Sequence, residues 1–311
     1  MVSVEPVSAP RVCVVGSINT DFTFRTPRLP RGGETLEGTS FQLGYGGKGA
    51  NQAVMAARLG AAVAMVARVG RDTFGDQSLA NLRKEAIDVT HVRVDDTVSS
   101  GVAAVIVDAA GQNSIIVVPG ANAALRPEHV QQAGTAIRSS QAVVCQLEVP
   151  IETVLESFRI AKAAGVRTIL NPAPPASLPD ELLRLTDICV PNETELAALT
   201  GQTAATKDDA IRAGRSVLER GPRIVVITLG AAGALIVDGD GIAHLPAASV
   251  VALDTAGAGD AFIGTLAVLI SAGMPLPAAV HKANAVAALS VTRPGTQASF
   301  PTREEVRALL A

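Results

Sequence analysis

Short apolar runs alternate with longer segments of mixed apolar and polar residues along most of the chain. Val12 to Gly16 forms such a run, which is typical of a strand buried on both faces of a parallel sheet. Similar runs lie at 62–69, 142–147, 167–171, 187–191 and 224–229. Segments of helical length lie at 50–59, 74–87, 127–139, 151–164 and 207–220, with three more helices starting near residues 259, 276 and 302. This alternation predicts an α/β fold, a mostly parallel sheet with helices on both faces.

Four strand-like pieces interrupt this alternation, at 22–24, 34–43, 101–108 and 114–118. The last two flank Ala109 to Asn113, a turn-forming stretch, and therefore predict a hairpin. We expect inserts at about 17–25, 34–43 and 101–118 to form a small β-sheet lid, as needed where water must be kept from an activated phosphate. No linker divides residues 11–311, which indicates one domain, and residues 1–10 are expected to be a loose tail.

The composition narrows the possible ligands. Hydrophobic residues make up 48% of the 311 residues but aromatic residues only 3%, so the core must be aliphatic and stacking on nucleic-acid bases is disfavoured. A net charge of −3, without long runs of Lys and Arg, argues against a nucleic-acid partner. The apolar segment 261–274 is too short to span a bilayer, and the three cysteines show no CxxC pattern. We expect a cytoplasmic protein with small ligands and no membrane partner.

A glycine turn that leads into an apolar helix is the strongest candidate for chemistry. In Leu253 to Phe262, the backbone N–H groups of 256–259 should be free at the helix start, where the helix dipole favours an anion such as phosphate. Gly257 and Gly259 leave no Cβ in the path of a ligand. Asp260 would repel phosphate there unless it acts as a base beside a transferring phosphoryl group. The alternative is an ordinary helix start, with Asp260 interacting with the dipole.

Polar side chains follow the first strand and the second glycine turn. Asn19 and Asp21 lie just past the end of the first strand, where ligands bind in open α/β sheets, and could hold sugar hydroxyls; an Asx turn is the alternative. The glycine turn 44–49 presents Lys48 and Asn51. It matches GxGxxG, but it follows no buried first strand, and Lys48 is not followed by Ser or Thr at the right place for a Walker A loop.

Other strand ends carry polar clusters that should line the same rim of the sheet. These clusters are Glu148, 171–174, 192–195 and 228–233. Glu195 or Glu193 could hold Mg²⁺ through water, because that ion prefers few carboxylates together with substrate phosphates. Gly230 and Gly233 could let the backbone pass close to a nucleotide. For each cluster alone, a capped helix or a turn is an equally good interpretation; their convergence favours a site.

Taken together, four motifs resemble those of the ribokinase (PfkB carbohydrate kinase) family. They are Gly16-Ser-Ile-Asn-Thr-Asp21, Gly46-Gly-Lys-Gly-Ala-Asn-Gln-Ala53, Asn192-Glu-Thr-Glu195 and Asp254-Thr-Ala-Gly-Ala-Gly-Asp260. The resemblance extends from about Arg11 to the end and includes 120–124, 146–148, 171–174 and 291–297. The second motif is more characteristic of the ribokinase branch than of the nucleoside or fructose-phosphate branches. The resemblance implies a Rossmann-like sheet with a β lid that also joins two subunits into a homodimer.

The resemblance also assigns roles to residues. Asp260 would deprotonate the terminal hydroxyl of the sugar, and the N–H groups of Gly257, Ala258 and Gly259 would form the anion hole. The sugar would contact Asn19, Asp21, Gly47, Lys48, Gly49, Asn51, Glu148 and Asp260. ATP would contact Asn192, Thr228, Leu229, Gly230, Gly233, Gly259 and Asn284. Glu195 would place Mg²⁺ or another divalent cation through water. A K⁺ site would use Asp254, Ala256, Ser290, Arg293, Gly295 and Ser299, largely through carbonyl oxygens, although Ala256 replaces the Thr that is common in the family.

These observations lead to one main hypothesis and three alternatives. The main hypothesis is ATP-dependent phosphorylation of D-ribose at its terminal hydroxyl, O5. A related kinase acting on deoxyribose, another pentose or a nucleoside is the first alternative, although one Tyr and seven Phe offer few aromatic faces for a base. A sugar-binding protein without catalysis should lack the base or the glycine turn, and both are present. A dinucleotide dehydrogenase is the weakest alternative.

Overall fold

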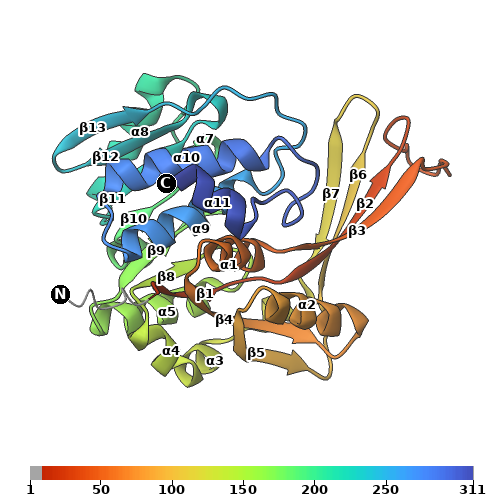
Figure 1. The fold of residues 1–311 in the computed structure, drawn as a ribbon, viewed down its shortest axis with the longest axis horizontal. Helices are drawn as coiled ribbons and strands as arrows, with labels where there is room; N and C mark the ends of the chain where they lie inside the picture. Colours follow the sequence, from red (N-terminus) through yellow and green to blue (C-terminus); the bar gives the residue numbers. More distant parts are fainter. Residues whose placement is uncertain (1–8, 311) are drawn as a thin grey trace, which may run out of the picture.

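The computed structural model describes residues 9–310 and contains two β-sheets (Figure 1). Most of the expected N-terminal tail, residues 1–8, lies outside the described residues. The larger sheet has the spatial order β13 (Gly241–Leu245), β12 (Ala234–Asp238), β11 (Ile224–Thr228), β10 (Ile188–Cys189), β9 (Arg167–Leu170), β8 (Ala142–Cys145), β1 (Arg11–Val15), β4 (Ala62–Gly70) and β5 (Asp88–Asp95). Neighbouring strands are parallel except in the two pairs that include β12.

Helices cover both faces of this sheet, as β1 illustrates. Val12 and Val14 join one core cluster, whereas Cys13 and Val15 join the other, because successive side chains of a strand point to opposite faces. The first face carries α1 (Lys48–Arg58), α2 (Thr73–Lys84), α9 (Ala258–Ser271), α10 (Leu276–Ser290) and α11 (Arg303–Leu310). The second carries α3 (Pro127–Gln132), α4 (Gly134–Ser139), α5 (Ile151–Ala163), α6 (Asp180–Arg184), α7 (Glu193–Thr200) and α8 (Lys207–Glu219). This arrangement confirms the predicted α/β class.

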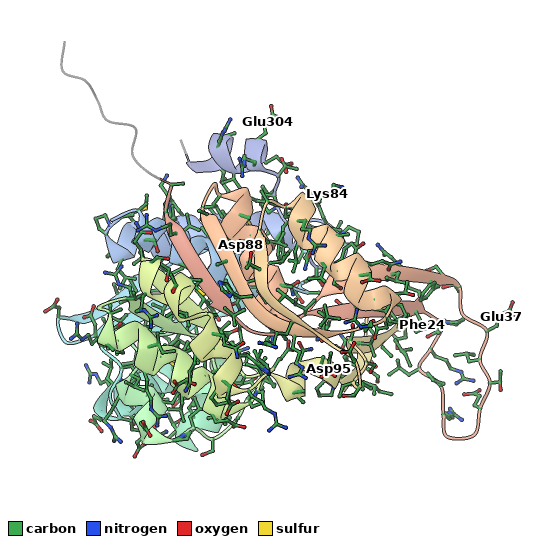
Figure 2. The ribbon with its side chains drawn as sticks, turned by 90° about the horizontal axis from the view of Figure 1, so that it is seen from below. Phe24, Glu37, Lys84, Asp88, Asp95 and Glu304 are labelled. Atoms are coloured by element: carbon green, nitrogen blue, oxygen red, sulfur yellow. The ribbon has the colours of Figure 1, made fainter. Side chains whose placement is uncertain are left out.

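The smaller sheet projects from one edge of the main body (Figure 1). Its order is β3 (Ser40–Gly46), β2 (Asn19–Arg25), β6 (Gly101–Val107) and β7 (Asn113–Val118). Figure 2 shows Glu37 on the long loop between β2 and β3, which extends away from the main sheet. Large apolar side chains remain exposed on this sheet, among them Ile116 at 64% and Phe41 at 55%. We call these four strands the lid.

The structure corrects several predicted boundaries. The strand expected over 34–43 starts only at Ser40 and continues to Gly46, so Gly44 and Gly46 lie in a strand and the turn begins at Gly47. The helix expected over 127–139 is divided between α3 and α4 at Ala133. The sequence interpretation missed β5, β12 and β13. These strands lie at the two ends of the main sheet, and β5 and β13 bury too few of their side chains to produce a recognisable apolar run.

Candidate active site

The start of α9 opens onto a cleft. Gly257 precedes the helix with a φ of 77°, a left-handed conformation that favours glycine. Among the described residues, no partner is found for the N–H groups of Gly257 and Gly259. The cleft, of about 210 Å³, is lined by Lys48, Asn171, Val190, Asn192, Glu195, Thr228, Thr255, Gly257, Gly259, Asp260 and Ile263. Free amides, a lysine and a carboxylate therefore share one small polar space.

Two of the four amides expected to be free are already used. The Ala256 N–H donates to the Asp254 carboxylate at 2.9 Å, and the Ala258 N–H donates to the Thr255 carbonyl at 3.3 Å. The prediction of free N–H groups at Ala256 and Ala258 was therefore wrong, because the turn that precedes the helix satisfies them locally. The Ala258 bond is long, and the Gly257 and Gly259 amides are left for an anion.

Asp260 is one of two buried acids in this cleft, with 6% of its surface exposed; Glu195 is the other. Asp260 Oδ2 accepts a hydrogen bond from Asn51 Nδ2 and Asp260 Oδ1 accepts one from Gln52 Nε2, both at 2.9 Å. Burial raises the pKa of Asp260; the charge of Lys48 and the two amides oppose this shift without cancelling it. A carboxylate with a raised pKa and a fixed orientation is suited to act as a general base.

Lys48 supplies positive charge to the same space from the first residue of α1. Burial acts to lower the pKa of Lys48, but the nearby carboxylates of Asp260, Glu148 and Glu195 raise it above its ordinary value. The side chain is therefore an ammonium ion. Among the described residues it forms no ion pair, which leaves its charge available to a phosphate.

The glycine turn before Lys48 packs directly on the end of β1. Gly47 has a φ of 86°, and a Cβ at Gly49 would lie 2.6 Å from the backbone nitrogen of Ser17. Glu148 holds the two segments together, because its Oε2 accepts from Ser17 Oγ at 2.5 Å and from the Lys48 N–H at 3.0 Å. The turn needs glycine for close packing, not only to admit a ligand.

A second, larger cavity lies beside the first, under the lid. It measures about 440 Å³ and is lined by Asn19, Val117, Pro119, Asn122, Ala123, Leu147, Glu148, Val149, Pro150 and Pro174. Asn19 is held by Asn122, whose Nδ2 donates to Asn19 Oδ1 at 2.7 Å. The sequence-predicted residues Asn19 and Glu148 thus face one cavity, and Lys48 and Asp260 face the other.

Asp21 lies on β2 and is not among the lining residues of either cavity, but it is near enough to Glu148 and Asp260 for their charges to act on it. Burial, followed by repulsion from Glu148 and Asp260, raises the pKa of Asp21 to about 7. A Cβ at Gly46 would lie 2.2 Å from Asp21 Oδ2, so glycine at Gly46 makes room for this carboxylate. No hydrogen bond to its side chain is found among the described residues. A partly buried carboxylate without a partner is an open acceptor for ligand hydroxyls.

The predicted nucleotide residues fall into two groups. Asn192 and Thr228 line the first cleft, whereas Leu229, Gly230, Gly233 and Asn284 are not among its lining residues. Asn284 Nδ2 donates to the Leu245 carbonyl at 2.9 Å, and a Cβ at Gly233 would lie 2.2 Å from the same oxygen. Gly233 and Asn284 therefore meet the end of β13, while Leu229 and Gly230 lie in the turn that ends at Gly233.

Glu195 is engaged in a helix cap at the wall of the first cleft. Its Oε2 accepts from the Asn192 N–H and its Oε1 from Asn192 Nδ2, both at 2.9 Å, while the Glu195 N–H donates back to Asn192. Burial raises the pKa of Glu195. Oε2 also accepts from Asn171 Nδ2 at 3.4 Å. Oε1 retains a lone pair, so the carboxylate can still accept from water in the cleft.

The residues of the predicted K⁺ site lie in two adjacent loops, apart from Ser290, which is the last residue of α10. Asp254 joins them, because its Oδ1 accepts from the Ala256 N–H and its Oδ2 from the Gly295 N–H, each at 2.9 Å. Ser290 and Ser299 donate their hydroxyls to nearby carbonyls, and Arg293 pairs with Glu305. No cluster of three or more His, Cys, Asp or Glu occurs in residues 9–310. Any ion between these loops would have to rely on carbonyl oxygens.

The structure also identifies site residues that the sequence interpretation left without a role. Gln52, fully buried, holds Asp260, and Gln146 Nε2 donates to Gln52 Oε1 at 2.5 Å. Gln297 Nε2 donates to Asn51 Oδ1 at 3.0 Å. Amides on the buried face of a helix are costly without partners, and this was the available signal for Gln52.

Known proteins match this chain over nearly its whole length. The model of the pfkB family of carbohydrate kinases matches residues 9–303. A deoxyribokinase of Salmonella typhi is 42% identical, covering 96% of this chain and 98% of its own, and a ribokinase of Mus musculus is 40% identical, covering 96% and 94%. The structure of an Arabidopsis thaliana ribokinase complexed with ribose and ATP superposes with a TM-score of 0.91 at 33% identity, covering 97% of this chain and 99% of that one.

Proposed function

Because this chain belongs to the pfkB family of carbohydrate kinases, we propose that it transfers the γ-phosphoryl group of ATP to O5 of D-ribose. The supporting observation is the placement of Asp260: a buried carboxylate, fixed by two amides, in a cleft shared with Lys48 and with the free amides of Gly257 and Gly259. Phosphoryl transfer requires such a base next to groups that stabilise negative charge.

In this proposal the sugar lies between the two cavities. Its terminal hydroxyl faces Asp260, which takes the proton as the oxygen attacks the γ-phosphorus. The developing charge on the phosphoryl oxygens is stabilised by the Gly257 and Gly259 N–H groups and by the Lys48 ammonium. The remaining hydroxyls are held by Asn19, Asp21 and Glu148, with Gly47, Gly49 and Asn51 closing the turn around the sugar.

Asp21 favours ribose over deoxyribose. A partly buried carboxylate without a protein partner gains most from a ligand that offers adjacent hydroxyl groups, and it discriminates against an analogue that lacks one. A deoxyribose kinase is the second candidate, supported by the relative from Salmonella typhi. A nucleoside is disfavoured, because no aromatic residue is among the described residues that line either cavity.

ATP extends from the anion hole along the ends of β10 and β11. Asn192 and Thr228 line the path of the phosphates. The adenosine end would lie at the turn formed by Leu229, Gly230 and Gly233 and at Asn284, which contacts the end of β13. Relatives with ATP or ADP bound support nucleotide use, including the ribokinase from Cryptococcus neoformans in complex with ADP.

The residues also fit two cations. Glu195 would hold Mg²⁺ through water, and the ion would supply charge neutralisation at the ATP phosphates. Asp254, Ala256, Ser290, Arg293, Gly295 and Ser299 would hold K⁺. This proposal depends on Asp254, whose carboxylate accepts one backbone N–H from each of the two loops. Because the loops are held in this way, their carbonyl oxygens would be positioned before an ion binds.

The lid would join two copies of the chain. The four residues from Ile115 to Val118, which lie on β7, are each about half exposed or more. Phe41 and Leu43 on β3 add to this apolar surface. Surfaces of this kind mark association sites. We expect Ile116→Lys to convert a dimer into a monomer in sedimentation analysis, with Ile242→Lys on β13 as the matched control; a wild-type monomer would contradict the proposal.

The protein is proposed to act in the cytoplasm. Cys13, Cys145 and Cys189 are buried free thiols, which suits a reducing compartment where ATP is available. Among residues 9–310, no helix has the length and apolar character needed to cross a membrane.

A panel of sugars with ATP tests the substrate assignment. We expect ADP formation with D-ribose to exceed that with 2-deoxyribose in kcat/KM, with little turnover of nucleosides or hexoses. Repeating the panel with K⁺ replaced by a bulky organic cation should lower the rate, and chelation of divalent ions should abolish it. Preferential turnover of deoxyribose would assign the second candidate function instead.

A further inference from the structure

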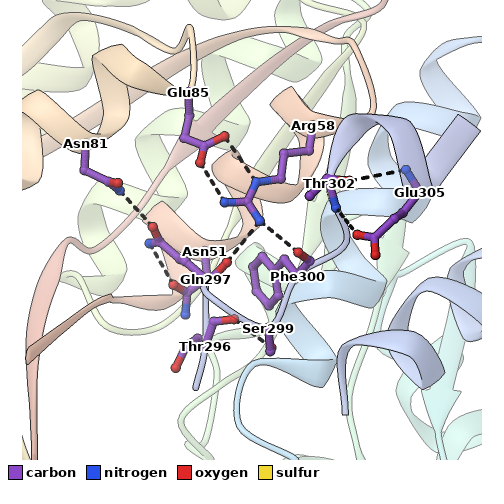
Figure 3. Close-up of polar contacts among 10 residues, drawn as sticks. All are labelled: Asn51, Arg58, Asn81, Glu85, Thr296, Gln297, Ser299, Phe300, Thr302 and Glu305. Carbon is purple, nitrogen blue, oxygen red and sulfur yellow. Dashed lines mark hydrogen bonds and ion pairs between the residues drawn. The ribbon is translucent and has the colours of Figure 1, made fainter. Parts of the chain in front are cut away.

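The carboxylate of Asp260 lies at the inner end of a chain of side-chain amides. Its Oδ2 accepts from Asn51, Asn51 Oδ1 accepts from Gln297 at 3.0 Å, and Gln297 Oε1 accepts from Asn81 Nδ2 at 2.9 Å. Figure 3 shows the three amides in series, from α2 through the C-terminal loop to α1. The chain thus connects Asp260 to a helix that takes no part in either cavity.

The charge of Asp260 gives this chain a direction. An ionised carboxylate only accepts hydrogen bonds, so Asn51 must turn its NH₂ group towards it. Asn51 then presents its oxygen to Gln297, which must donate, and Gln297 presents its own oxygen to Asn81. Reversal of any one amide would bring two oxygens face to face. The three amides therefore have a single mutually compatible orientation while Asp260 is ionised.

Gln297 is itself held in place by Arg58. The guanidinium Nη1 of Arg58 donates to the carbonyls of Gln297 at 3.0 Å and Phe300 at 2.9 Å, and Nη2 pairs with Glu85 at 2.6 Å (Figure 3). Arg58 and Asn51 lie seven residues apart on α1, two helical turns, and so share one face of that helix. One helix face therefore fixes both the backbone and the side chain of Gln297.

We propose that Gln297 is a positioning residue for phosphoryl transfer, which holds Asn51, and through it the Asp260 carboxylate, in the orientation that accepts the sugar proton. This inference rests on the proposed function. Gln297 is 6% exposed and is not among the residues that line either cavity, so it does not touch the substrates. Its contribution should therefore appear in kcat rather than in KM.

The charged groups around Asp260 are the same in the wild type and in a Gln297→Met variant, which introduces no charge. Lys48 on α1, Glu148 after β8, Asp21 on β2 and Glu195 on α7 are the charged groups that act on Asp260 or are acted on by it. None of them is altered by substitutions at Gln297 or Asn81. A change in the acid limb of the pH profile of kcat between the wild type and Gln297→Met therefore reports on the amide chain, whereas Asn81→Asp adds a charge and needs the double variant as its control.

Gln297→Met keeps the length of the side chain and removes both its donor and its acceptor. We expect kcat to fall by about 3- to 10-fold, the loss of one hydrogen bond, with KM for the sugar changed by less than about twofold. The acid limb should move to higher pH, because Asn51 is no longer held with its NH₂ group on Asp260. Gln131→Met, on the exposed part of α3, is the matched control. An unchanged kcat and acid limb in Gln297→Met would overturn the inference.

Asn81→Asp tests the direction of the chain. An aspartate at this position can only accept, so Gln297 and then Asn51 are driven to reverse, which brings an oxygen towards Asp260 and raises its pKa. We expect the acid limb to shift upward by roughly half a pH unit or more, and the Asn81→Asp/Gln297→Met double variant to lose that additional shift. A shift that persists in the double variant would mean that the new charge acts through space, and would contradict the role of Gln297.

A second measurement needs no turnover and separates this inference from the proposed function. In a double-mutant cycle of Asp260→Asn and Gln297→Met, read by chemical unfolding, coupled residues give non-additive changes in unfolding free energy. If the two substitutions are coupled but the protein phosphorylates no sugar, the amide chain is supported and the proposed function is wrong. If the changes are additive but the protein is an active ribose kinase, the role of the amide chain is contradicted and the proposed function is supported.

Discussion

The start of α9 and the entry to the lid each carry one of the two aspartates that we propose act on the sugar, but the surroundings of these two side chains differ. Asp260 has both oxygens bound by buried amides of α1, whereas Asp21 on β2 has no side-chain partner among the described residues. The first region is complete before any ligand arrives. In the proposed function, the second would gain hydrogen-bond partners only when the hydroxyl groups of the sugar enter. Asp260 is thus oriented in advance for the reaction, whereas Asp21 keeps free acceptor positions for substrate recognition. Such a division of roles suits a kinase.

The largest effect in this comparison should come from Asp260→Asn. We expect kcat to fall by roughly 10²- to 10⁴-fold, because the proton of the attacking hydroxyl loses its acceptor. The affinity for ATP, measured by calorimetry, should change little. Asp208→Asn on the exposed start of α8 is the control. If kcat survives, the preorganised aspartate is not the base.

Asp21→Asn should affect sugar recognition rather than the chemical step. We expect kcat/KM for ribose to fall by about 10- to 100-fold, mostly through KM, since a neutral amide is a weaker partner for sugar hydroxyls than a carboxylate. The KM for ATP should stay within about twofold. The loss should be smaller for 2-deoxyribose, which offers fewer hydroxyls. An equal loss for both sugars would show that Asp21 does not read the difference between them.

Substitution of two glycines at the start of α9 should affect stability and phosphate binding differently. A Cβ at Gly257 would lie 2.7 Å from Thr296 Cγ2 on a backbone with positive φ, so Gly257→Ala should lower the unfolding free energy by about 1–2 kcal/mol. A Cβ at Gly259 meets nothing within 4 Å, so Gly259→Ala should fold as stably as the wild type or better. It should still reduce kcat/KM for ATP by about 10-fold, because its methyl group occupies the approach to the free amides. Full activity of Gly259→Ala would argue against this anion hole.

The smallest effect is a dependence of stability on pH. Because the pKa of Asp21 is raised from 3.8 to about 7, the folded protein retains a proton that the unfolded chain has lost between these values. The contribution of Asp21 to the free energy of unfolding therefore falls as the pH rises from about 4 to about 7. Above the folded pKa, the ionised Asp21 carboxylate destabilises the folded protein. Asp21→Asn should be more stable than the wild type at about pH 8 and similar to it near pH 4, by thermal unfolding. Equal stability at both pH values would mean that Asp21 is already satisfied without sugar.

Much of the fold could be predicted because buried parallel strands leave an unambiguous apolar run. Val12 to Val15 is an example, and the strand lies where it was expected. β5 and β13 at the sheet ends, which bury only part of their side chains, leave no such run and were missed. The start of strand β3 at Ser40 was also misplaced, because the preceding loop contains the same kinds of residues.

The site could be predicted at its glycine turns and strand ends, where sequence neighbours lie together in space. Asp260 and Lys48 share one cleft, as expected. The amides that support them could not be found in this way. Gln297 and Asn51 are separated by 246 residues, and their contact exists only after α1 has packed against the C-terminal loop. Likewise, the bond between the Ala256 N–H and Asp254 depends on the local geometry of the turn rather than on residue type.

The most direct test of the central claim is to identify the product by ³¹P and ¹³C NMR after the wild type and Asp260→Asn are incubated with ATP and D-ribose. We predict D-ribose 5-phosphate from the wild type, and no detectable product in the same time from Asp260→Asn, although calorimetry shows that this variant binds ATP. Phosphorylation at another hydroxyl, or formation of the same product at the same rate by the variant, would contradict the account.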